Sequence, residues 1–259
     1  MMAAAVVEFS EVESADYVAG GRVGGRGGVG VMWRGKLEAM VAETRAATFQ
    51  AMEFFVSWQG VLTIAYSGIP PSLLQLKEHI DEEYPGLVKE NPGSKWPKTS
   101  LACLRDNQRL SMEQLQRLHD ICSKESVTLA STSEPVIVNK LSVVLYADCC
   151  LEHPMLVTDI PLRAPVDLSG PSAEQQASVR KVLDVFLRHN LNSYYFHASK
   201  DGNRSTHYRD YKGGVTLVHF LSSIPVALAK FKEQVEEAMP GMYDWFSEES
   251  LHVTLRALL

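Results

Sequence analysis

The stretch Leu251-His252-Val253-Thr254-Leu255-Arg256-Ala257-Leu258, near the end of the 259-residue chain, decides how the rest of the sequence is interpreted. The segment Lys98-Thr99-Ser100-Leu101-Ala102-Cys103-Leu104 repeats its pattern of a basic nitrogen, a hydroxyl two residues later, and surrounding leucines. Side chains alternate between the two faces of a strand, so His252, Thr254 and Arg256 share one face, and Lys98 and Ser100 share one face with Leu101 and Cys103 behind them. The two stretches therefore predict a pair of equivalent strands.

These two strands end a longer internal repeat. Ile69-Pro70 corresponds to Ile224-Pro225, and Pro85-Gly86 corresponds to Pro240-Gly241, each at an offset of 155 (224 − 69 and 241 − 86). At the final strands the offset becomes 154 (252 − 98), which is a deletion of one residue. Each copy thus predicts a strand, a helix that begins at proline and ends at Pro-Gly, a loop, and a final strand.

The repeat predicts an α+β protein of two similar lobes, related by a pseudo-two-fold axis, with mostly antiparallel sheets around a central groove. The first repeat covers about 60–104 and the second about 215–258, within one bilobal domain of 34–259. Such an axis brings the two final strands face to face. Because side chains alternate between the faces of a strand, we expect His252, Thr254 and Arg256 to face Lys98 and Ser100.

In the other segments, the hydrophobic period and the turn residues predict the secondary structure. The expected helices are 34–56, 69–83, 111–123 and 173–189. The expected strands are 60–67, 98–104, 136–138, 141–146 and 156–160, together with a hairpin of 194–197 and 215–220 around the loop 199–214.

The composition of residues 1–33 predicts a tail outside the domain. The Gly/Arg run at 20–30 has few side chains to bury, so it cannot offset the entropy cost of ordering, and we expect disorder. Arg22, Arg26 and Arg34 could contact RNA, although a plain flexible tail is the favoured interpretation. An organelle transit peptide is a further alternative, against which the early acidic residues count.

Composition restricts the class of protein. The 46% hydrophobic and 22% charged residues are typical of a globular domain, and no apolar run approaches the roughly twenty residues of a membrane span. A net charge of −6 argues against a protein that coats DNA, but it leaves room for a local site for a nucleotide or RNA end. Four cysteines without framework spacing favour an intracellular location, in cytoplasm or nucleus.

The paired motif resembles that of the two-histidine phosphoesterase superfamily, which includes RNA ligase-like and cyclic nucleotide phosphodiesterase-like proteins. His252-Val253-Thr254-Leu255 matches the family's His-x-Thr/Ser-x motif fully. Lys98-Thr99-Ser100-Leu101 matches it except that lysine stands where the family has histidine. The resemblance extends from about residue 60 to the C-terminus. It implies a duplicated, two-lobed α+β fold that works without a metal or a cofactor.

The resemblance also implies roles for these residues in opening a 2′,3′-cyclic phosphate or a related diester. His252 would act as the base, Lys98 as an electrostatic clamp or acid, and Ser100, Thr254 and Arg256 would bind the phosphate. Lysine is a cation at pH 7 and a poor base, so two functions stay open. One is a metal-independent cyclic phosphodiesterase with an altered first motif. The other is a catalytically inactive module that binds a nucleotide or a protein partner.

The simpler structural interpretation is a histidine at the edge of the core and a solvated lysine, and it would be favoured without the repeat. The loop 199–214 is a second candidate region. Its Lys200, Arg204, His207 and Tyr208 could supply a phosphate clamp or a base-stacking ring. A solvated hairpin loop is the favoured interpretation of the same residues.

The remaining histidines and cysteines are interpreted as structural. Cys149 and Cys150, followed by Glu152 and His153, lack the second pair of ligands that a zinc site requires, so no metal is expected. His219 corresponds to Ile64 under the offset of 155 (219 − 64). A position in the core is therefore the safer expectation for His219.

Overall fold

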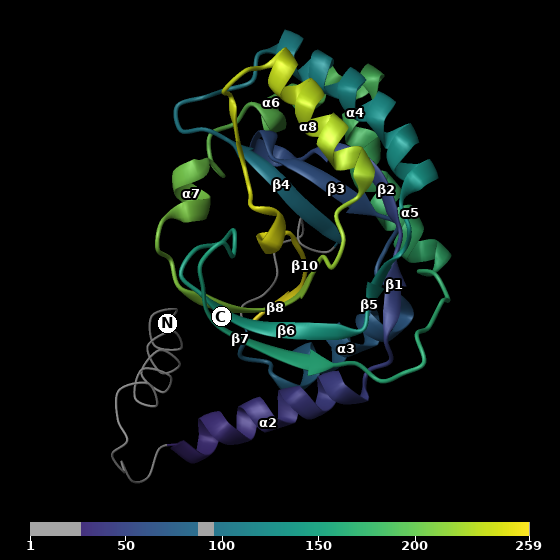
Figure 1. The fold of residues 1–259 in the computed structure, drawn as a ribbon, viewed down its shortest axis with the longest axis vertical. Coiled ribbons are helices and arrows are strands. Elements are labelled where there is room, and N and C mark those ends of the chain that lie inside the picture. The colour runs from purple at the N-terminus through teal and green to yellow at the C-terminus, as the bar shows by residue number, and fades with distance from the viewer. Residues whose placement is uncertain (1–26, 88–95, 259) are drawn as a thin grey trace.

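Two four-stranded antiparallel sheets face one another, and helices cover the outer side of each (Figure 1). The computed structural model describes residues 27–87 and 96–258. The first sheet has the order β2-β3-β4-β9, with bounds Ala51–Val56, Leu62–Tyr66, Lys98–Leu104 and Tyr243–Trp245. The second has the order β10-β8-β6-β7, with bounds His252–Ala257, Gly214–Phe220, Lys140–Tyr146 and Pro154–Pro161. The predicted α+β class with antiparallel sheets is confirmed.

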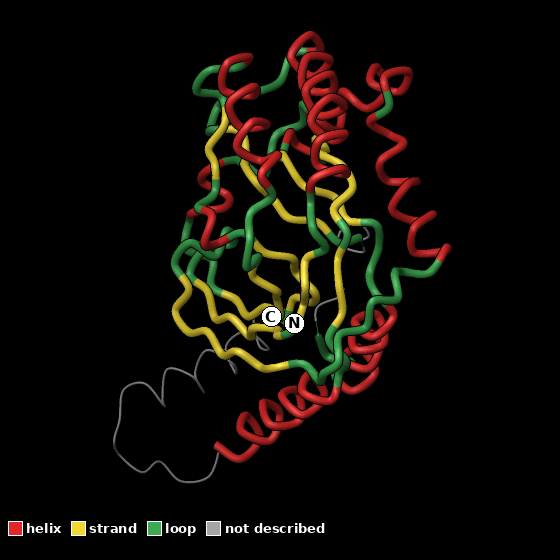
Figure 2. Tube along the Cα trace, turned by 45° about the vertical axis from the view of Figure 1, so that its right-hand side comes forward, coloured by secondary structure: helices red, strands yellow, loops and turns green. Residues whose placement is uncertain are grey.

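Helices lie toward the two ends of the molecule, with the strands between them, and one short helix, Ser205–Arg209, lies at the side of the sheets (Figure 1, Figure 2). They are α2 (Gly27–Glu43), α3 (Pro71–Glu83), α4 (Met112–Thr132), α5 (Ala173–Leu183), α6 (Leu191–Ala198), α7 (Ser205–Arg209) and α8 (Val226–Ala238). Short 3-10 turns are η1 (Trp58–Gly60), η3 (Asp184–Phe186), η4 (Arg188–Asn190) and η5 (Glu248–Ser250). A separate two-stranded ladder joins β1 (Ala47–Phe49) to β5 (Val136–Val138). Within the described ranges, no helix combines the length and apolarity needed to cross a bilayer.

Helix starts follow the sequence signals. α3 begins at Pro71, and α8 begins directly after Pro225, as the repeat predicted. Proline suits these positions because the first turn of a helix leaves its N–H groups without intrahelical partners. α4 begins after Ser111, whose hydroxyl accepts from the backbone N–H of Gln114 in a capping box. α4 continues to Thr132, nine residues (132 − 123) past its expected end.

α3 and α8 each pack on the sheet opposite to that of the strand that precedes them. α3 follows β3 of the first sheet, yet Lys77 Nζ donates to the carbonyl of Leu255 in β10 of the second sheet at 2.6 Å. α8 follows β8 of the second sheet, yet Phe231 stacks on Phe54 of β2 in the first, with 4.0 Å between ring centroids. α3 lies between β3 and β4, which pair antiparallel with each other. α8 lies between β8 and β9, and the chain passes through β9 of the first sheet before it returns to the second sheet as β10, which pairs antiparallel with β8. Each helix therefore links the two sheets.

The helix predicted over 34–56 is wrong beyond Glu43, where α2 ends. The residues after it form β1 and β2, because aromatic and branched side chains such as Phe54, Phe55 and Val56 suit a pleated surface. α2 also begins earlier than expected. Residues 27–33, predicted as part of a disordered tail, belong to this helix, while 1–26 lie outside the described residues.

The predicted hairpin of 194–197 with 215–220 is also wrong, because its first arm is part of α6. Tertiary contacts favour the helix: the Tyr194 hydroxyl donates to the carbonyl of Val56 at 2.9 Å, and the Tyr195 hydroxyl to that of Leu110 at 3.0 Å. β8 pairs with β6 and β10 instead. The helix expected over 173–189 ends at Leu183, and 3-10 turns follow.

Candidate functional site

β4 and β10, which carry the paired motif, approach within 8 Å of each other between Cα atoms. In the ladder of β10 with β8, His252 lies opposite Phe220 and Thr254 lies opposite Val218. The outer face of this sheet is the one against α3, where Arg256 Nε donates to Asp81. Arg256 lies on the face opposite to Thr254, because the pairing of β10 with β8 shifts by one residue between them. His252 and Thr254 therefore lie on the inner face, toward the first sheet.

Lys98 and Ser100 lie on the inner face of the first sheet. Ser100 pairs with Thr63 of β3, and the next β3 residue, Ile64, pairs with Phe54 of β2. The ring of Phe54 packs on α8, which marks that face as the outer one. Because neighbouring residues of a strand alternate, Ser100 and Lys98 face away from α8. The structure thus places both halves of the paired motif on facing sides of the two sheets.

His252 is held as a neutral imidazole with a defined tautomer. Its Nδ1 lies 2.6 Å from the carbonyl oxygen of Ser250, which can only accept, so Nδ1 carries the proton and Nε2 is left as the basic nitrogen. Burial lowers the pKa of His252, although the bond to Ser250 opposes this shift. The ring of Phe220 stands edge-on at 6.0 Å between centroids. A neutral imidazole with an available Nε2 is what a general base requires.

Lys98 is anchored by an aromatic ring. Its Nζ lies 4.6 Å from the ring centroid of Trp96, within the range of a cation–π interaction. Trp96 is itself buried and meets Phe55 edge-on, with 5.7 Å between centroids. Trp96 escaped the sequence analysis because it precedes the motif and shares no pattern with the other repeat. The ring keeps an ammonium group beside β4.

Tyr208 is the member of the loop 199–214 that reaches the paired motif in the described structure. Its side chain shares a hydrogen bond with Ser100, and burial raises the pKa of the Tyr208 phenol. Its ring lies 4.9 Å from that of Phe246 between centroids. Tyr208 therefore stays protonated at neutral pH and orients the Ser100 hydroxyl.

Arg204 is committed to the backbone. Its guanidinium is buried and donates to the carbonyls of Gln108 and Gln59, both at 2.9 Å, and to those of Gly202 and Lys200. These bonds fix the loop against the end of β4, where a short β-bridge joins Leu104 to Arg204. The structure assigns Arg204 a supporting position and gives it no contact with the paired motif.

Lys200 and His207, the other two loop candidates, have exposed side chains. The Nζ of Lys212 donates to His207 Nδ1 at 2.8 Å, and burial with the nearby charge of Lys212 lowers the pKa of His207. The structure does not bring these two side chains into contact with Lys98 or His252.

The prediction that Arg256 shares a face with His252 and Thr254 is wrong. A β-bulge interrupts β10: Thr254 lies opposite Val218, but Arg256 lies opposite Leu217. Neighbouring residues of β8 point to opposite faces, so Arg256 is turned away from Thr254. Its Nε donates to Asp81 Oδ1 of α3 at 2.8 Å. A bulge has no clear sequence signal, which is why alternation alone failed here.

An ion network that the sequence did not reveal holds α7 in place. Arg209 donates to Glu152 through Nε at 2.9 Å and through Nη2 at 3.1 Å, and also pairs with Asp244 of β9. The backbone N–H of Ser247 donates to the same Glu152 carboxylate at 2.8 Å. These contacts tie α7, β9 and the loop after β6 together, and thereby position Tyr208.

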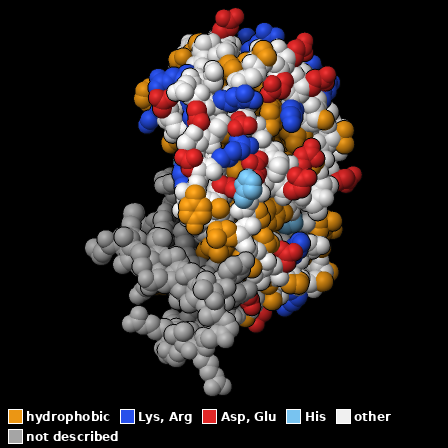
Figure 3. Space-filling view, turned by 60° about the vertical axis from the view of Figure 1, so that its left-hand side comes forward, with side chains coloured by type: hydrophobic (Ala, Val, Ile, Leu, Met, Phe, Trp, Pro, Cys, Tyr) orange, Lys and Arg blue, Asp and Glu red, His pale blue; other side chains and the backbone are white. Residues whose placement is uncertain are grey.

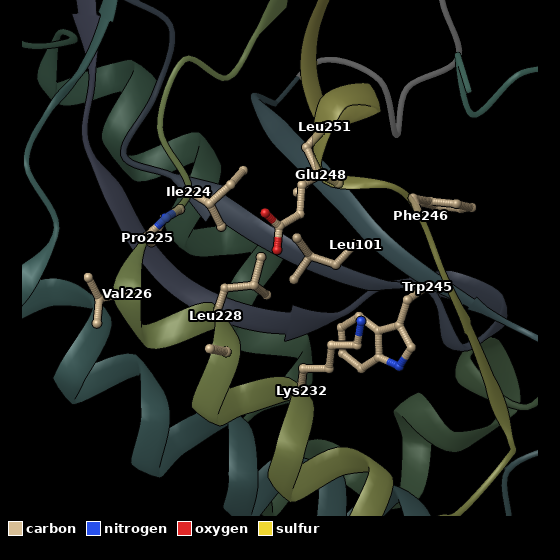
Figure 4. Close-up of a pocket in the computed structure, with 11 residues that line it drawn as sticks. Leu101, Ile224, Pro225, Val226, Leu228, Lys232, Trp245, Phe246, Glu248 and Leu251 are labelled. Atoms are coloured by element: carbon tan, nitrogen blue, oxygen red, sulfur yellow. The ribbon is translucent and has the colours of Figure 1, made fainter. Parts of the chain in front are cut away.

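A pocket beside α8 lies apart from the paired motif (Figure 4). Leu101, Ile224 and Leu228 line it with apolar side chains, and the carboxylate of Glu248 points into it. At the edge of the pocket, the Nζ of Lys232 lies 5.3 Å from the ring centroid of Trp245. Because this pocket is on the α8 side of the first sheet, it does not include Lys98 or Ser100.

Surface charge is mixed rather than gathered by sign. On the face drawn in Figure 3, basic and acidic side chains are interspersed, and hydrophobic side chains gather below them. Across 27–87 and 96–258, no three His, Cys, Asp or Glu side chains converge as metal ligands. Near Cys150, Asp148 accepts from the thiol at 3.0 Å and lies 2.8 Å from His153 Nδ1, while burial raises the pKa of Cys150.

Comparisons with known proteins yield no match for this chain among family models, curated proteins or solved structures. The site is therefore defined by its own geometry. It consists of an imidazole with an available Nε2, an ammonium held over an indole ring, and two hydroxyls, on facing strands.

The burial of His219 leads to a prediction of how the free energy of unfolding depends on pH. His219 is 3% exposed, and its Nδ1 lies 3.1 Å from the carbonyl of Lys140. Burial lowers its pKa. The unfolded chain therefore binds more protons below about pH 6.5, and the free energy of unfolding falls as the pH drops from 7 to 5. Urea unfolding at several pH values measures this fall.

His219→Asn retains a donor for the Lys140 carbonyl and should show the smaller decrease. His189→Asn is the control because its side chain is exposed, and its decrease should match that of the wild type. Equal decreases in all three proteins would contradict the assignment to His219.

Proposed function

We propose that β4 and β10 form a binding site for a phosphate ester, and that the protein hydrolyses or binds a 2′,3′-cyclic phosphate or a short RNA end. The observation that carries this proposal is the facing of Lys98 and Ser100 by His252 and Thr254, on strands within 8 Å between Cα atoms. The ammonium of Lys98 and the hydroxyls of Ser100 and Thr254 can each donate to a phosphate oxygen, and His252 Nε2 can accept a proton beside it. A phosphate ester is a ligand that all four side chains can contact.

The chemistry follows from the protonation states. His252 Nε2 takes a proton from the attacking water as its oxygen bonds to phosphorus. The bond from phosphorus to one ribose oxygen breaks, and that oxygen takes a proton from the Lys98 ammonium. Ser100 and Thr254 donate to the non-bridging oxygens, where charge develops. Exchange with solvent then returns a proton to Lys98 and removes one from His252.

We further infer that the fold is a duplication, with two lobes related by a pseudo-two-fold axis. The segments β3-α3-β4 and β8-α8-β9-β10 support this inference, because each has a proline at the helix start and its first and last strands pair antiparallel; β9, inserted in the second segment, pairs with β4 of the first sheet. Each helix also packs on the opposite sheet. Together with the paired motif, this arrangement supports the resemblance to two-histidine phosphoesterases. The partner would be a nucleotide or RNA end, in cytoplasm or nucleus.

The second candidate function is a catalytically inactive module that binds a nucleotide. The position of Lys98 over Trp96 favours it, because a lysine held as a cation binds an anion well but serves poorly as a base. In this version His252 and the two hydroxyls contact the phosphate without transferring a proton.

Hydrolysis of a 2′,3′-cyclic nucleotide distinguishes the two functions. For the enzyme, we expect slow turnover that falls about a hundredfold in His252→Ala, since general base catalysis contributes about this much. Lys98→His restores a second imidazole and is expected to raise turnover about tenfold or more. The control His189→Ala changes an exposed histidine outside the site and should leave turnover unchanged.

Equal turnover in the wild type and in His252→Ala would contradict the enzyme. Calorimetric titration with the same nucleotide then tests the binding module, which requires weaker binding in Lys98→Ala and in His252→Ala. Equal binding by all three proteins, or binding by none, would contradict the site itself.

A further inference from the structure

The pocket beside α8 is a small cavity of about 230 Å³ with an apolar floor. Leu101 of β4 and Leu228 of α8 are buried there, and Ile224 lines it just before the start of α8 (Figure 4). Sites for drug-sized ligands have volumes of about 300–1,000 Å³. This cavity therefore suits a smaller molecule, whose apolar part has the size of one amino-acid side chain.

Hydrogen bonds and ring contacts hold the walls of this pocket in place. The carbonyl of Leu101 accepts from the backbone N–H of Phe246 at 2.9 Å. The indole N–H of Trp245 donates to Glu236 at 2.7 Å, and its ring meets Phe231 edge-on. The pocket is therefore formed before a ligand enters it, and little conformational entropy is lost when one binds.

Two charged side chains of opposite sign line the same pocket. The carboxylate of Glu248 points into it, and among the described residues that carboxylate has neither an ion pair nor a hydrogen bond (Figure 4). Lys232 forms no ion pair in that part of the chain either, and its Nζ lies 5.3 Å from the ring centroid of Trp245. The pocket therefore presents one negative and one positive group beside its apolar floor, and no described residue neutralises either of them.

We propose that this pocket binds a free α-amino acid with an apolar side chain, such as leucine. The ammonium of the ligand pairs with Glu248, and its carboxylate pairs with Lys232. The side chain of the ligand enters between Leu101, Ile224 and Leu228. At neutral pH an α-amino acid carries both charges, so it complements both side chains at once.

Ligands with one charge or none fit these residues less well. An apolar amine would bring its ammonium near that of Lys232, and an apolar carboxylic acid would bring its carboxylate near that of Glu248, and like charges repel. A neutral apolar molecule would take water from both charged groups and return no partner to either. A zwitterion is therefore the class of ligand that the charges of this pocket select.

Calorimetric titration of the full chain with L-leucine, 3-methylbutylamine and 4-methylpentanoate tests the proposal. The second compound lacks the carboxylate of leucine and the third lacks its ammonium, while both keep its apolar part. We expect leucine to bind with a dissociation constant of about 1 mM or below. Each of the other two compounds should bind about tenfold more weakly, because each loses one charge-assisted pair.

Glu248→Gln and Lys232→Met assign each charge of the ligand to its partner. Both side chains are exposed, so both variants should fold like the wild type. Each variant should bind leucine about tenfold more weakly. Glu248→Gln should bind 4-methylpentanoate no more weakly than the wild type does, and Lys232→Met should bind 3-methylbutylamine no more weakly, because in each case the lost charge had no partner on that compound.

Glu249→Gln is the matched control, since Glu249 is an exposed neighbour of Glu248 that does not line the pocket. It should bind leucine like the wild type. The proposal would be overturned by a wild type that does not bind leucine, or by one that binds either single-charge compound as tightly as leucine. Equal leucine binding by Glu248→Gln and Glu249→Gln would overturn it as well.

Discussion

Phe231→Ala is expected to lower the free energy of unfolding by about 4 kcal/mol, close to a thousandfold in the unfolding equilibrium. Phe231 is 0% exposed and lies between Phe54, stacked at 4.0 Å, and Trp245, edge-on at 6.2 Å between centroids. Its removal leaves a cavity between α8 and the first sheet. Urea unfolding followed by far-ultraviolet circular dichroism measures the loss.

The matched control is Phe196→Ala, which truncates a phenylalanine that is 67% exposed. We expect it to change stability by no more than about 0.5 kcal/mol. Phe231→Leu should lie between the two because it refills most of the cavity. A loss below about 1 kcal/mol for Phe231→Ala would show that α8 does not depend on this contact.

Arg204→Ala is expected to cost about 3 kcal/mol, because it leaves several carbonyls without the donor that satisfies them. The carbonyls of Gln59 and Gln108 each lie 2.9 Å from the guanidinium, and Arg204 is 8% exposed. The lysine ammonium cannot replace a planar guanidinium that donates in several directions, so Arg204→Lys should recover only part of the lost stability. Thermal unfolding of both variants provides the measurement.

Arg109→Ala is the control for Arg204. Arg109 pairs with Asp201 in the same region, but both side chains are largely exposed, so its removal should leave stability unchanged. The loop also carries Tyr208 toward Ser100, and hydrogen exchange in 199–213 should therefore rise in Arg204→Ala and stay constant in Arg109→Ala. Equal behaviour of the two variants would contradict a special position for Arg204.

The sequence predicted the elements whose signals are local. Proline at the start of α3 and α8, and apolar runs of strand length in β3, β4 and β10, predict those elements without help from the rest of the chain. β2 and α6 were missed because their conformations depend on distant partners, such as the Val56 carbonyl that binds Tyr194. No local pattern states on which sheet a helix packs, so the crossing of α3 and α8 was also unforeseen.

The candidate site shows the same division. Alternation was sufficient to place His252 with Thr254 and Lys98 with Ser100, because both pairs precede the irregularities in their strands. It failed at Arg256, beyond the bulge. The contacts of Trp96 with Lys98 and of Tyr208 with Ser100 arise from loop packing, which hydrophobic period does not encode.

The crossing of α3 and α8 has a kinetic consequence. The Lys77–Leu255 bond closes a loop of 178 residues, and Phe54 meets Phe231 across 177 (231 − 54). α3 and α8 reach their places on the sheets only after chain segments this far apart have met, and contacts of such sequence separation slow folding. The two sheets are therefore expected to fold and unfold together in one transition, and a chain synthesised only through β4 exposes the surface that α8 later covers.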